Sequence, residues 1–370
     1  MDLRNEAMEK ERGMTRNAFK AIARGGCALA SALIWLGIAT VAPTRAAQVE
    51  APYRLTKSVP LGPGEKWDLV TFDPDAERAY VAHGDHVTVV DTGKGEVVGN
   101  VGPISGKTQG IAIVPGGARG YTDDSKRGVA IAFDLRSLKP VRDIAAKPDA
   151  DAIVYEPVTR HVFVINADSG SVTVIDPASD SAMATIDVGS GLEGGVSDGK
   201  GDIFVNGVEK NEIVRIDART DKVVVRWAMP DCERPHGLAM DTETRRLFAT
   251  CVNQIMVVMD ADNGTTVARL PIGRFSDGAA FDPVRKLAFS SNGDGTLTVI
   301  REKDPEHFDP LATVPTQLGA RTMAIDPRSG RLFLVAAKVE KVTPSTTPGG
   351  RPSISYVPGS LQLLYFDPAT

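Results

Sequence analysis

The clearest hydrophobic pattern in the chain lies in residues 149–189. Within this stretch, four short runs alternate apolar and polar positions or are dominated by β-branched residues: 151–155, 161–165, 171–176 and 181–188. The links between them are short and contain Pro, Asp, Ser, Asn or Gly, which favour turns. The pattern predicts four antiparallel strands in a meander. A single small sheet that is apolar on both faces cannot bury itself, so it needs neighbouring copies.

Copies of this unit follow along the chain at a nearly constant distance. The third strand of each copy ends at Asp91, Asp134, Asp176, Asp217, Asp260, Arg301 and Asp367, in steps of 43, 42, 41, 43, 41 and 66 residues. The turn after the first strand recurs at Asp73, Val114, Glu156, Asp198, Asp241, Asp282 and Asp326, in steps of 41 to 44 residues. Seven copies with a period of about 42 predict an all-β fold, a seven-bladed β-propeller with four-stranded antiparallel blades. We expect the recurrent Asp side chains to shape turns.

The predicted blades leave two segments outside the regular repeat. They cover residues 67–104, 105–147, 148–189, 190–231, 232–273, 274–316 and 317–370. The last copy stops where the others turn into their fourth strand, and the strand-like segment 53–61 precedes the first copy. We predict that this segment completes the last blade and closes the ring. The second segment is an insertion at 338–359, rich in Pro, Gly, Ser and Thr, for which a loop that is either functional or disordered is expected.

The N-terminus carries the pattern of a secretory signal. Arg16, Lys20 and Arg24 precede a 15-residue apolar run at 27–41, and small residues suited to cleavage after Ala46 follow. This predicts a signal peptide at 1–46 and a propeller domain at 47–370, located in the periplasm or secreted and without a membrane span after cleavage. An uncleaved anchor is the alternative, and translation starts at Met1 or Met14.

Charge and cysteine content narrow the function classes. The net charge of −5 includes +3 from residues 1–46, which leaves −8 on the mature chain. An acidic chain lacks the general positive field that favours nucleic acid, so we do not expect nucleic acid as a partner. The mature chain keeps Cys232 and Cys251. Three interpretations stay open for them: a disulfide that staples the fifth blade, two buried thiols, or a reactive or metal-binding pair of Cys251 with His236.

The repeat resembles a known family. A strand followed by an Asp-Pro turn, a second strand of the Arg-x-apolar-Val type and a third strand ending in Val-Thr-Val-Ile-Asp is similar to the YVTN-type β-propeller repeat, with the YncE-like exported proteins as its nearest members. The best matches are residues 161–189 and 234–273. The resemblance covers the chain from about Tyr53 onwards and implies a WD40-like propeller. Family members include binding proteins, DNA-associated periplasmic proteins and, more distantly, haem-bearing and amine-dehydrogenase propellers. The chain has no C-x-x-C-H haem motif.

Propeller geometry places candidate chemistry where the innermost strands begin, around the central channel. The residues predicted to line this funnel are Trp67, Asp68, Gln109, Asp149, Asp151, Glu193, His236, Asp277 and Arg321. Such a funnel is acidic and suits a cation, a metal ion or a polyhydroxylated molecule. Glu193, Asn253 and Asp277 are an alternative set of metal ligands. His83 and His86 form an H-x-x-H pair without an evident third ligand, for which a polar turn is the simpler interpretation.

The sequence favours a binding protein. Motifs for a serine nucleophile, a zinc protease, a thiol redox pair or a phosphate loop are absent from the chain. We predict an exported, monomeric propeller that binds a protein partner or a small polar ligand at the face carrying the funnel and the 338–359 loop, with no assigned catalysis and no assigned cofactor beyond a divalent cation. The alternatives are a metal-dependent, lactonase-like hydrolase and an accessory subunit of a periplasmic quinone-linked or amine dehydrogenase.

Overall fold

The structure is a computed structural model that describes residues 51–64, 66–189, 191–347 and 350–369. These residues belong to one compact unit, Val49–Thr370. The predicted signal peptide lies outside them and stays a prediction. Every regular element in the described ranges is a β-strand, and none of these residues forms a helix that could cross a membrane.

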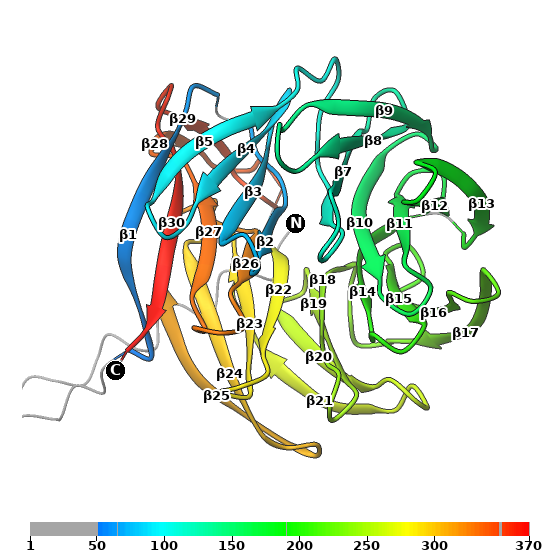
Figure 1. The fold of residues 1–370 in the computed structure, drawn as a ribbon. Coiled ribbons are helices and arrows are strands. Elements are labelled where there is room, and N and C mark those ends of the chain that lie inside the picture. Colours follow the sequence, from blue (N-terminus) through cyan, green and yellow to red (C-terminus); the bar gives the residue numbers. More distant parts are fainter. Residues whose placement is uncertain (1–50, 65, 190, 348–349, 370) are drawn as a thin grey trace, which may run out of the picture. The chain divides into compact units, whose positions relative to one another are not determined.

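Seven four-stranded antiparallel sheets follow one another, which confirms the predicted all-β, seven-bladed β-propeller (Figure 1). The first three sheets comprise β2 (Val70–Asp73), β3 (Arg78–His83), β4 (His86–Asp91) and β5 (Glu96–Val101); β6 (Ile111–Ile113), β7 (Arg119–Asp124), β8 (Val129–Asp134) and β9 (Pro140–Ala145); and β10 (Ala150–Glu156), β11 (His161–Asn166), β12 (Ser171–Asp176) and β13 (Ser181–Asp187).

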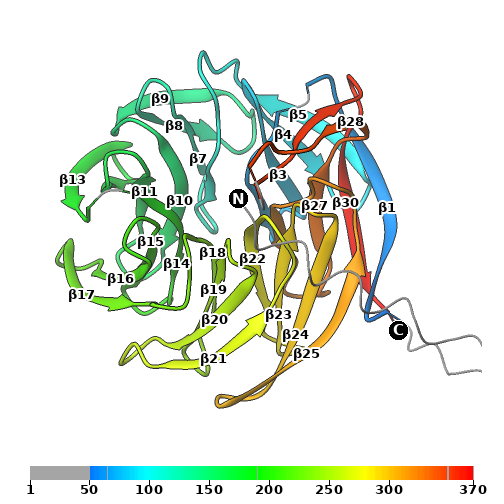
Figure 2. The same cartoon turned by 180° about the vertical axis from the view of Figure 1, so that it is seen from behind.

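The next three sheets repeat this order. They comprise β14 (Leu192–Ser197), β15 (Asp202–Gly207), β16 (Glu212–Asp217) and β17 (Lys222–Ala228); β18 (Pro235–Asp241), β19 (Arg246–Cys251), β20 (Ile255–Asp260) and β21 (Thr266–Pro271); and β22 (Ser276–Asp282), β23 (Leu287–Asn292), β24 (Thr296–Asp304) and β25 (His307–Pro315). The first strand of each sheet contacts the first strands of its neighbours, so these strands surround the channel (Figures 1 and 2).

The seventh sheet combines both ends of the described chain. Its strands are β26 (Met323–Ile325), β27 (Leu332–Ala336), β30 (Leu361–Pro368) and β1 (Tyr53–Gly62), with β1 antiparallel to β30 on the outside. Tyr53 is buried, and its hydroxyl donates a hydrogen bond to the Gly330 carbonyl oxygen at 3.0 Å. The outer strand is therefore tied into the core of the last blade.

Buried side chains fill the spaces between blades. Seven apolar clusters among the described residues each join two neighbouring sheets, including the seventh and the first. The second strand of every blade contributes one fully buried aromatic ring: Tyr80, Tyr121, Phe163, Phe204, Phe248, Phe289 and Phe333. These rings follow the same spacing as the turns, and the sequence analysis did not use them. Each blade is thus stabilised mainly by burial against its neighbours.

The recurrent aspartates act as predicted in the turns. A carboxylate oxygen at the end of the third strand accepts a hydrogen bond from a backbone N–H two or three residues further on, at 2.7 to 2.9 Å. The five pairs are Asp91 with Lys94, Asp134 with Ser137, Asp176 with Ala178, Asp217 with Arg219 and Asp260 with Asp262. These aspartates therefore have a structural role in the turns.

The insertion at 338–359 differs from its prediction as a loop. It folds into a two-stranded hairpin of β28 (Val339–Thr343) and β29 (Ser353–Tyr356). The backbone N–H of Val357 donates to the carbonyl oxygen of Lys338 at 2.8 Å, and this closes the base of the hairpin. Alternation of Val, Ile and Tyr with polar residues supports strand pairing here, and the abundance of Pro and Gly concealed it. In Figure 2 the hairpin lies in front of the seventh blade.

Cys232 and Cys251 are joined by a disulfide, one of the three interpretations left open by the sequence. The bond links the segment before β18 to the end of β19. Both residues are buried within the fifth blade.

Candidate functional site

The predicted funnel residues occupy equivalent positions. Asp151, Glu193, His236 and Asp277 are the second residues of β10, β14, β18 and β22, and the other five lie one to three residues before an innermost strand: Trp67, Asp68, Gln109, Asp149 and Arg321. Because these strands surround the channel, their starts form one mouth. We call these nine residues, together with the side chains that lie around them in space, the channel mouth.

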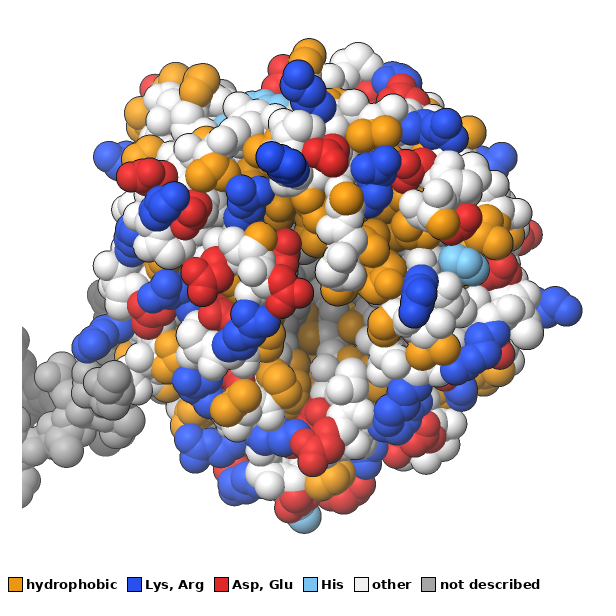
Figure 3. All heavy atoms as spheres, in the orientation of Figure 1, with side chains coloured by type: hydrophobic (Ala, Val, Ile, Leu, Met, Phe, Trp, Pro, Cys, Tyr) orange, Lys and Arg blue, Asp and Glu red, His pale blue; other side chains and the backbone are white. Residues whose placement is uncertain are grey.

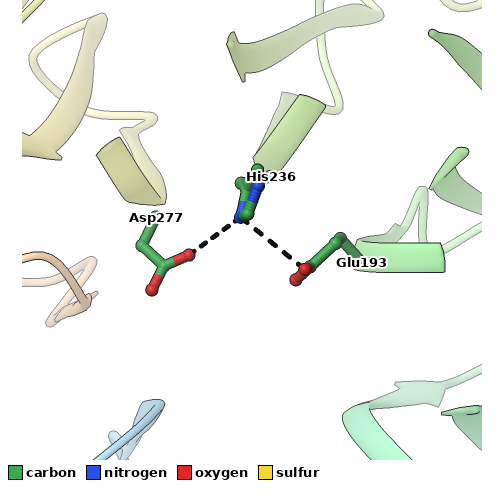
Figure 4. A group of neighbouring side chains, drawn as sticks. All are labelled: Glu193, His236 and Asp277. Atoms are coloured by element: carbon green, nitrogen blue, oxygen red, sulfur yellow. Dashed lines mark hydrogen bonds and ion pairs between the residues drawn. The ribbon is translucent and has the colours of Figure 1, made fainter. Parts of the chain in front are cut away.

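Three side chains converge in the channel mouth. The Nδ1 atom of His236 lies 3.1 Å from Oδ1 of Asp277 and 3.7 Å from Oε1 of Glu193 (Figure 4). They come from three successive blades, and one ligand atom from each lies within 4.8 Å of the others. This is the only such set of three metal-ligating side chains found among the described residues. Imidazole nitrogen and carboxylate oxygen suit zinc and other transition-metal ions.

Asp277 is the best-neutralised carboxylate at the mouth. Its other oxygen, Oδ2, accepts a hydrogen bond from Nε of Arg321 at 2.6 Å. Burial alone would raise the pKa of Asp277, but the bond from His236 and the charge of Arg321 together hold it well below its usual range. Asp277 is therefore ionised and fixes the orientation of both cationic or donor side chains.

Lys107 supplies a second positive charge that the sequence analysis missed. Its Nζ atom lies 2.8 Å from Oδ2 of Asp68 and also donates to Oε1 of Gln109. Burial raises the pKa of Asp68, and Lys107 opposes that shift. Lys107 lies in the connection between the first two blades, outside the strand pattern, so only its position two residues before Gln109 could have indicated its role.

Three carboxylates on the third and fourth blades are poorly compensated. In the described part of the chain, no Lys or Arg pairs with Asp149, Asp151 or Glu193, and Asp149 only accepts a long hydrogen bond of 3.5 Å from Gln109. Burial and then the negative charge of Asp68 raise the pKa of Asp151 to about 8. Burial and then Asp151 raise the pKa of Glu193 to about 9. These two groups hold protons near neutral pH, because ionising both would crowd buried negative charges.

The hairpin β28–β29 contributes aromatic and basic groups to the mouth. The ring of Tyr356 packs against the buried Trp67 with centroids 5.0 Å apart. The Arg321 guanidinium lies 5.9 Å from the Trp67 ring, and that of Arg351 lies 5.9 Å from the Phe275 ring. Sequence reasoning included Trp67 and Arg321 but missed the other three, because the hairpin is not part of the repeat and Phe275 stands one residue before β22.

Asn253 and the H-x-x-H pair lie outside the cluster of Glu193, His236 and Asp277. Both polar atoms of the Asn253 side chain bond backbone groups of its own blade, Glu233 N–H and Asp231 C=O, so His236 rather than Asn253 joins Glu193 and Asp277. The rings of His83 and His86 pack at a tilt, with centroids 4.5 Å apart, and both residues line a cavity of about 340 Å³ together with three lysines. The H-x-x-H pair is not part of the metal-ligating set found in the described ranges.

One face of the molecule can be compared with the mouth. On the face in Figure 3, basic and acidic side chains are interspersed around a central hollow. The uneven charge distribution belongs to the mouth rather than to this surface.

Comparison with known proteins identifies the fold class. No protein-family model and no curated protein match the chain in sequence. A structure of hydrazine synthase from Kuenenia stuttgartiensis is 16% identical, covering 82% of this chain and 97% of that one, with a TM-score of 0.64. A chain in a crystal structure of a mitotic checkpoint complex is 13% identical, covering 88% of this chain and 98% of its own, with a TM-score of 0.69. At such identities the likeness shows the β-propeller fold alone.

Proposed function

We propose that this protein is a binding propeller that takes a small cation, either a divalent metal ion or a primary ammonium, at the channel mouth. One observation carries the proposal: Asp149, Asp151 and Glu193 lie at the starts of two neighbouring innermost strands, the charges of Asp149 and Asp151 raise the pKa of Glu193, and no Lys or Arg pairs with any of the three in the described ranges. A cation placed among them replaces the protons that two of them hold and offsets the repulsion.

The ring supplies what such a site needs. The carboxylates stand at the starts of innermost strands that are hydrogen-bonded into their sheets, so little backbone ordering accompanies binding. Asp277 already pairs with His236 and Arg321, so its carboxylate does not compete for the cation. The proposed ligand therefore lies toward the third and fourth blades.

Calorimetric titration with calcium chloride and with butylamine tests the proposal. We expect at least one of them to bind with one site per chain, and Glu193→Gln to weaken that binding at least about tenfold, because an ion pair in a partly buried site is lost. Glu96→Gln, an exposed glutamate on β5, is the matched control and should leave binding unchanged. Absence of binding by both cations sinks the proposal.

A metal-dependent hydrolase is the second candidate function, and the convergence of Glu193, His236 and Asp277 favours it. A zinc ion held by these three side chains would have room for water, which it activates, and for a carbonyl oxygen, which it polarises. Metal analysis of the purified protein tests this candidate. Less than a stoichiometric amount of any divalent ion, together with no hydrolysis of simple lactones after zinc addition, excludes it.

Export stays part of the proposal and rests on the sequence pattern of residues 1–46. A disulfide within the fifth blade supports an oxidising compartment. Fractionation of cells that produce the full chain, with mass determination of the mature N-terminus, tests cleavage after Ala46. Capture from the same fraction tests the remaining alternatives, a protein partner and an accessory role beside a dehydrogenase.

A further inference from the structure

The channel mouth is divided into an acidic half and a basic half, and we propose that its ligand is a small zwitterion with an ammonium group at one end and a carboxylate at the other. This inference rests on the proposed cation site and adds the identity of the ligand's second end. The ammonium end lies with Asp151 and Glu193, and the carboxylate end lies with Arg321 and Arg351.

The acidic half lies on the third and fourth blades. Asp149 and Asp151 stand at the start of β10, and Glu193 at the start of β14. Lys107 does not neutralise these three carboxylates, because its ammonium group is bonded to Asp68 and Gln109. Primary ammonium groups are bound in proteins by two or three such oxygens, since –NH₃⁺ has three donors.

The basic half lies across the channel, on the side of β26, β27 and the hairpin (Figures 1 and 2). Arg321 precedes β26, and Arg351 precedes β29. Partial burial lowers the pKa of Arg351, and the positive charge of Arg321 lowers it further. The two guanidinium groups are therefore near each other. Only Asp277 forms a described ion pair with either of them, and it pairs with Arg321. Two neighbouring guanidiniums with one carboxylate partner favour a second, external anion.

An aromatic wall joins the two arginines. Trp67 lies beneath Arg321 and against Tyr356, and Phe275 lies beneath Arg351. Trp67 is only 5% exposed, and its indole Nε1–H has no hydrogen-bond acceptor among the described residues. A buried donor of this kind normally has a partner. A carboxylate held by the neighbouring arginine supplies an acceptor beside this ring.

Arg321 pairs with Asp277 and Lys107 pairs with Asp68, but among the described residues no Lys or Arg pairs with Asp151 or Glu193, and no Asp or Glu forms an ion pair with Arg351. An ion with a single charge satisfies one half and leaves the other uncompensated. A molecule with both charges satisfies both, while its short carbon chain covers apolar ring surface. Because the basic half depends on a hairpin found in only one blade, it is the part of the mouth that specifies the ligand.

Calorimetry with matched probes tests this inference on the mature chain. The probes are butylamine, γ-aminobutyrate and butyrate, and then hexylamine, ε-aminocaproate and hexanoate. We expect one of the two zwitterions to bind about tenfold tighter than the amine of the same chain length, since each charge-assisted pair adds binding free energy of that order. Arg351→Gln should remove this advantage by weakening zwitterion binding, so that the zwitterion binds no tighter than the amine of the same chain length. Arg136→Gln, in the exposed turn between β8 and β9, is the control.

The outcomes separate the two proposals. Amine or calcium binding without any advantage for a zwitterion overturns the inference and leaves the cation site standing. An advantage that survives Arg351→Gln also overturns it, because the hairpin then does not hold the carboxylate. Failure of calcium, amines and zwitterions alike overturns both.

Discussion

Glu193 and Asp151 have the most strongly altered acid–base behaviour of the acidic half of the mouth. For Glu193, burial and then the neighbouring Asp151 raise the pKa from 4.5 in the free side chain to about 9. A carboxyl whose pKa is higher in the folded state keeps its proton on folding, whereas the unfolded chain releases it. Stability conferred by this difference is complete below about pH 4.5 and is lost as the pH rises toward 9.

The first prediction follows at this scale. In buffer without divalent metal ions or primary amines, the thermal midpoint of the wild type should fall between about pH 5 and pH 9. Glu193→Gln should flatten this fall because glutamine cannot ionise. Differential scanning calorimetry at several pH values measures it, with Glu96→Gln as the control. Equal pH dependence in wild type and Glu193→Gln would show that the Glu193 proton does not contribute.

At the level of single residues, the sequence predicted the positions of the site residues better than the contacts between their side chains. All nine funnel residues lie within three residues of the start of an innermost strand, because the repeat fixes where each strand begins. Their pairing depends on side-chain direction and on neighbours from other blades. That is why His236, rather than Asn253, accompanies the two carboxylates, and why Lys107 and Arg351 were missed.

Strand β1 ties the beginning of the domain to its end. Tyr53 packs edge-on against Phe289 of the sixth blade, with ring centroids 5.1 Å apart, while Leu55 on the same strand is half exposed. We predict that Tyr53→Ala lowers the free energy of unfolding by about 3–5 kcal/mol, as for other large buried rings. Leu55→Ala should change it by less than about 0.5 kcal/mol. Urea unfolding measures both, and similar small effects would show that β1 contributes little.

The disulfide in the fifth blade also contributes to the stability of the domain. Cys232 and Cys251 are 19 residues apart, and a cross-link closing a loop of that size stabilises by about 3 kcal/mol. Reductant should lower the urea midpoint of the wild type, and the Cys232→Ala/Cys251→Ala double variant should be equally unstable with and without reductant. Two free thiols in the non-reduced, purified protein would contradict the bond itself.

The hairpin β28–β29 marks the limit of pattern-based prediction for elements. Composition indicated a loop because Pro, Gly, Ser and Thr dominate residues 344–352, which separate the two strands in the sequence. The two strands are short, and Tyr356 of β29 packs against Trp67, which belongs to another blade. Contacts between segments so far apart in sequence leave no local signal.

On the scale of the whole domain, the fold was the most predictable property. Each blade buries its faces against two neighbours, so every copy needs the same apolar strands, and two landmark series made the period visible. Function lacks this redundancy. The mouth is formed by one residue or two from each blade, each different, together with a hairpin that occurs once.

The most direct test of the account is proton release when a cation binds. Butylamine and calcium chloride are each titrated calorimetrically near pH 7.5 in two buffers that differ in ionisation enthalpy. Because Asp151 and Glu193, with pKa values raised to about 8 and about 9, hold protons until a cation displaces them, the account predicts a buffer-dependent heat from released protons. It also predicts that Asp151→Asn and Glu193→Gln each reduce this release. Binding whose heat is the same in both buffers, or no binding of either cation, would contradict it.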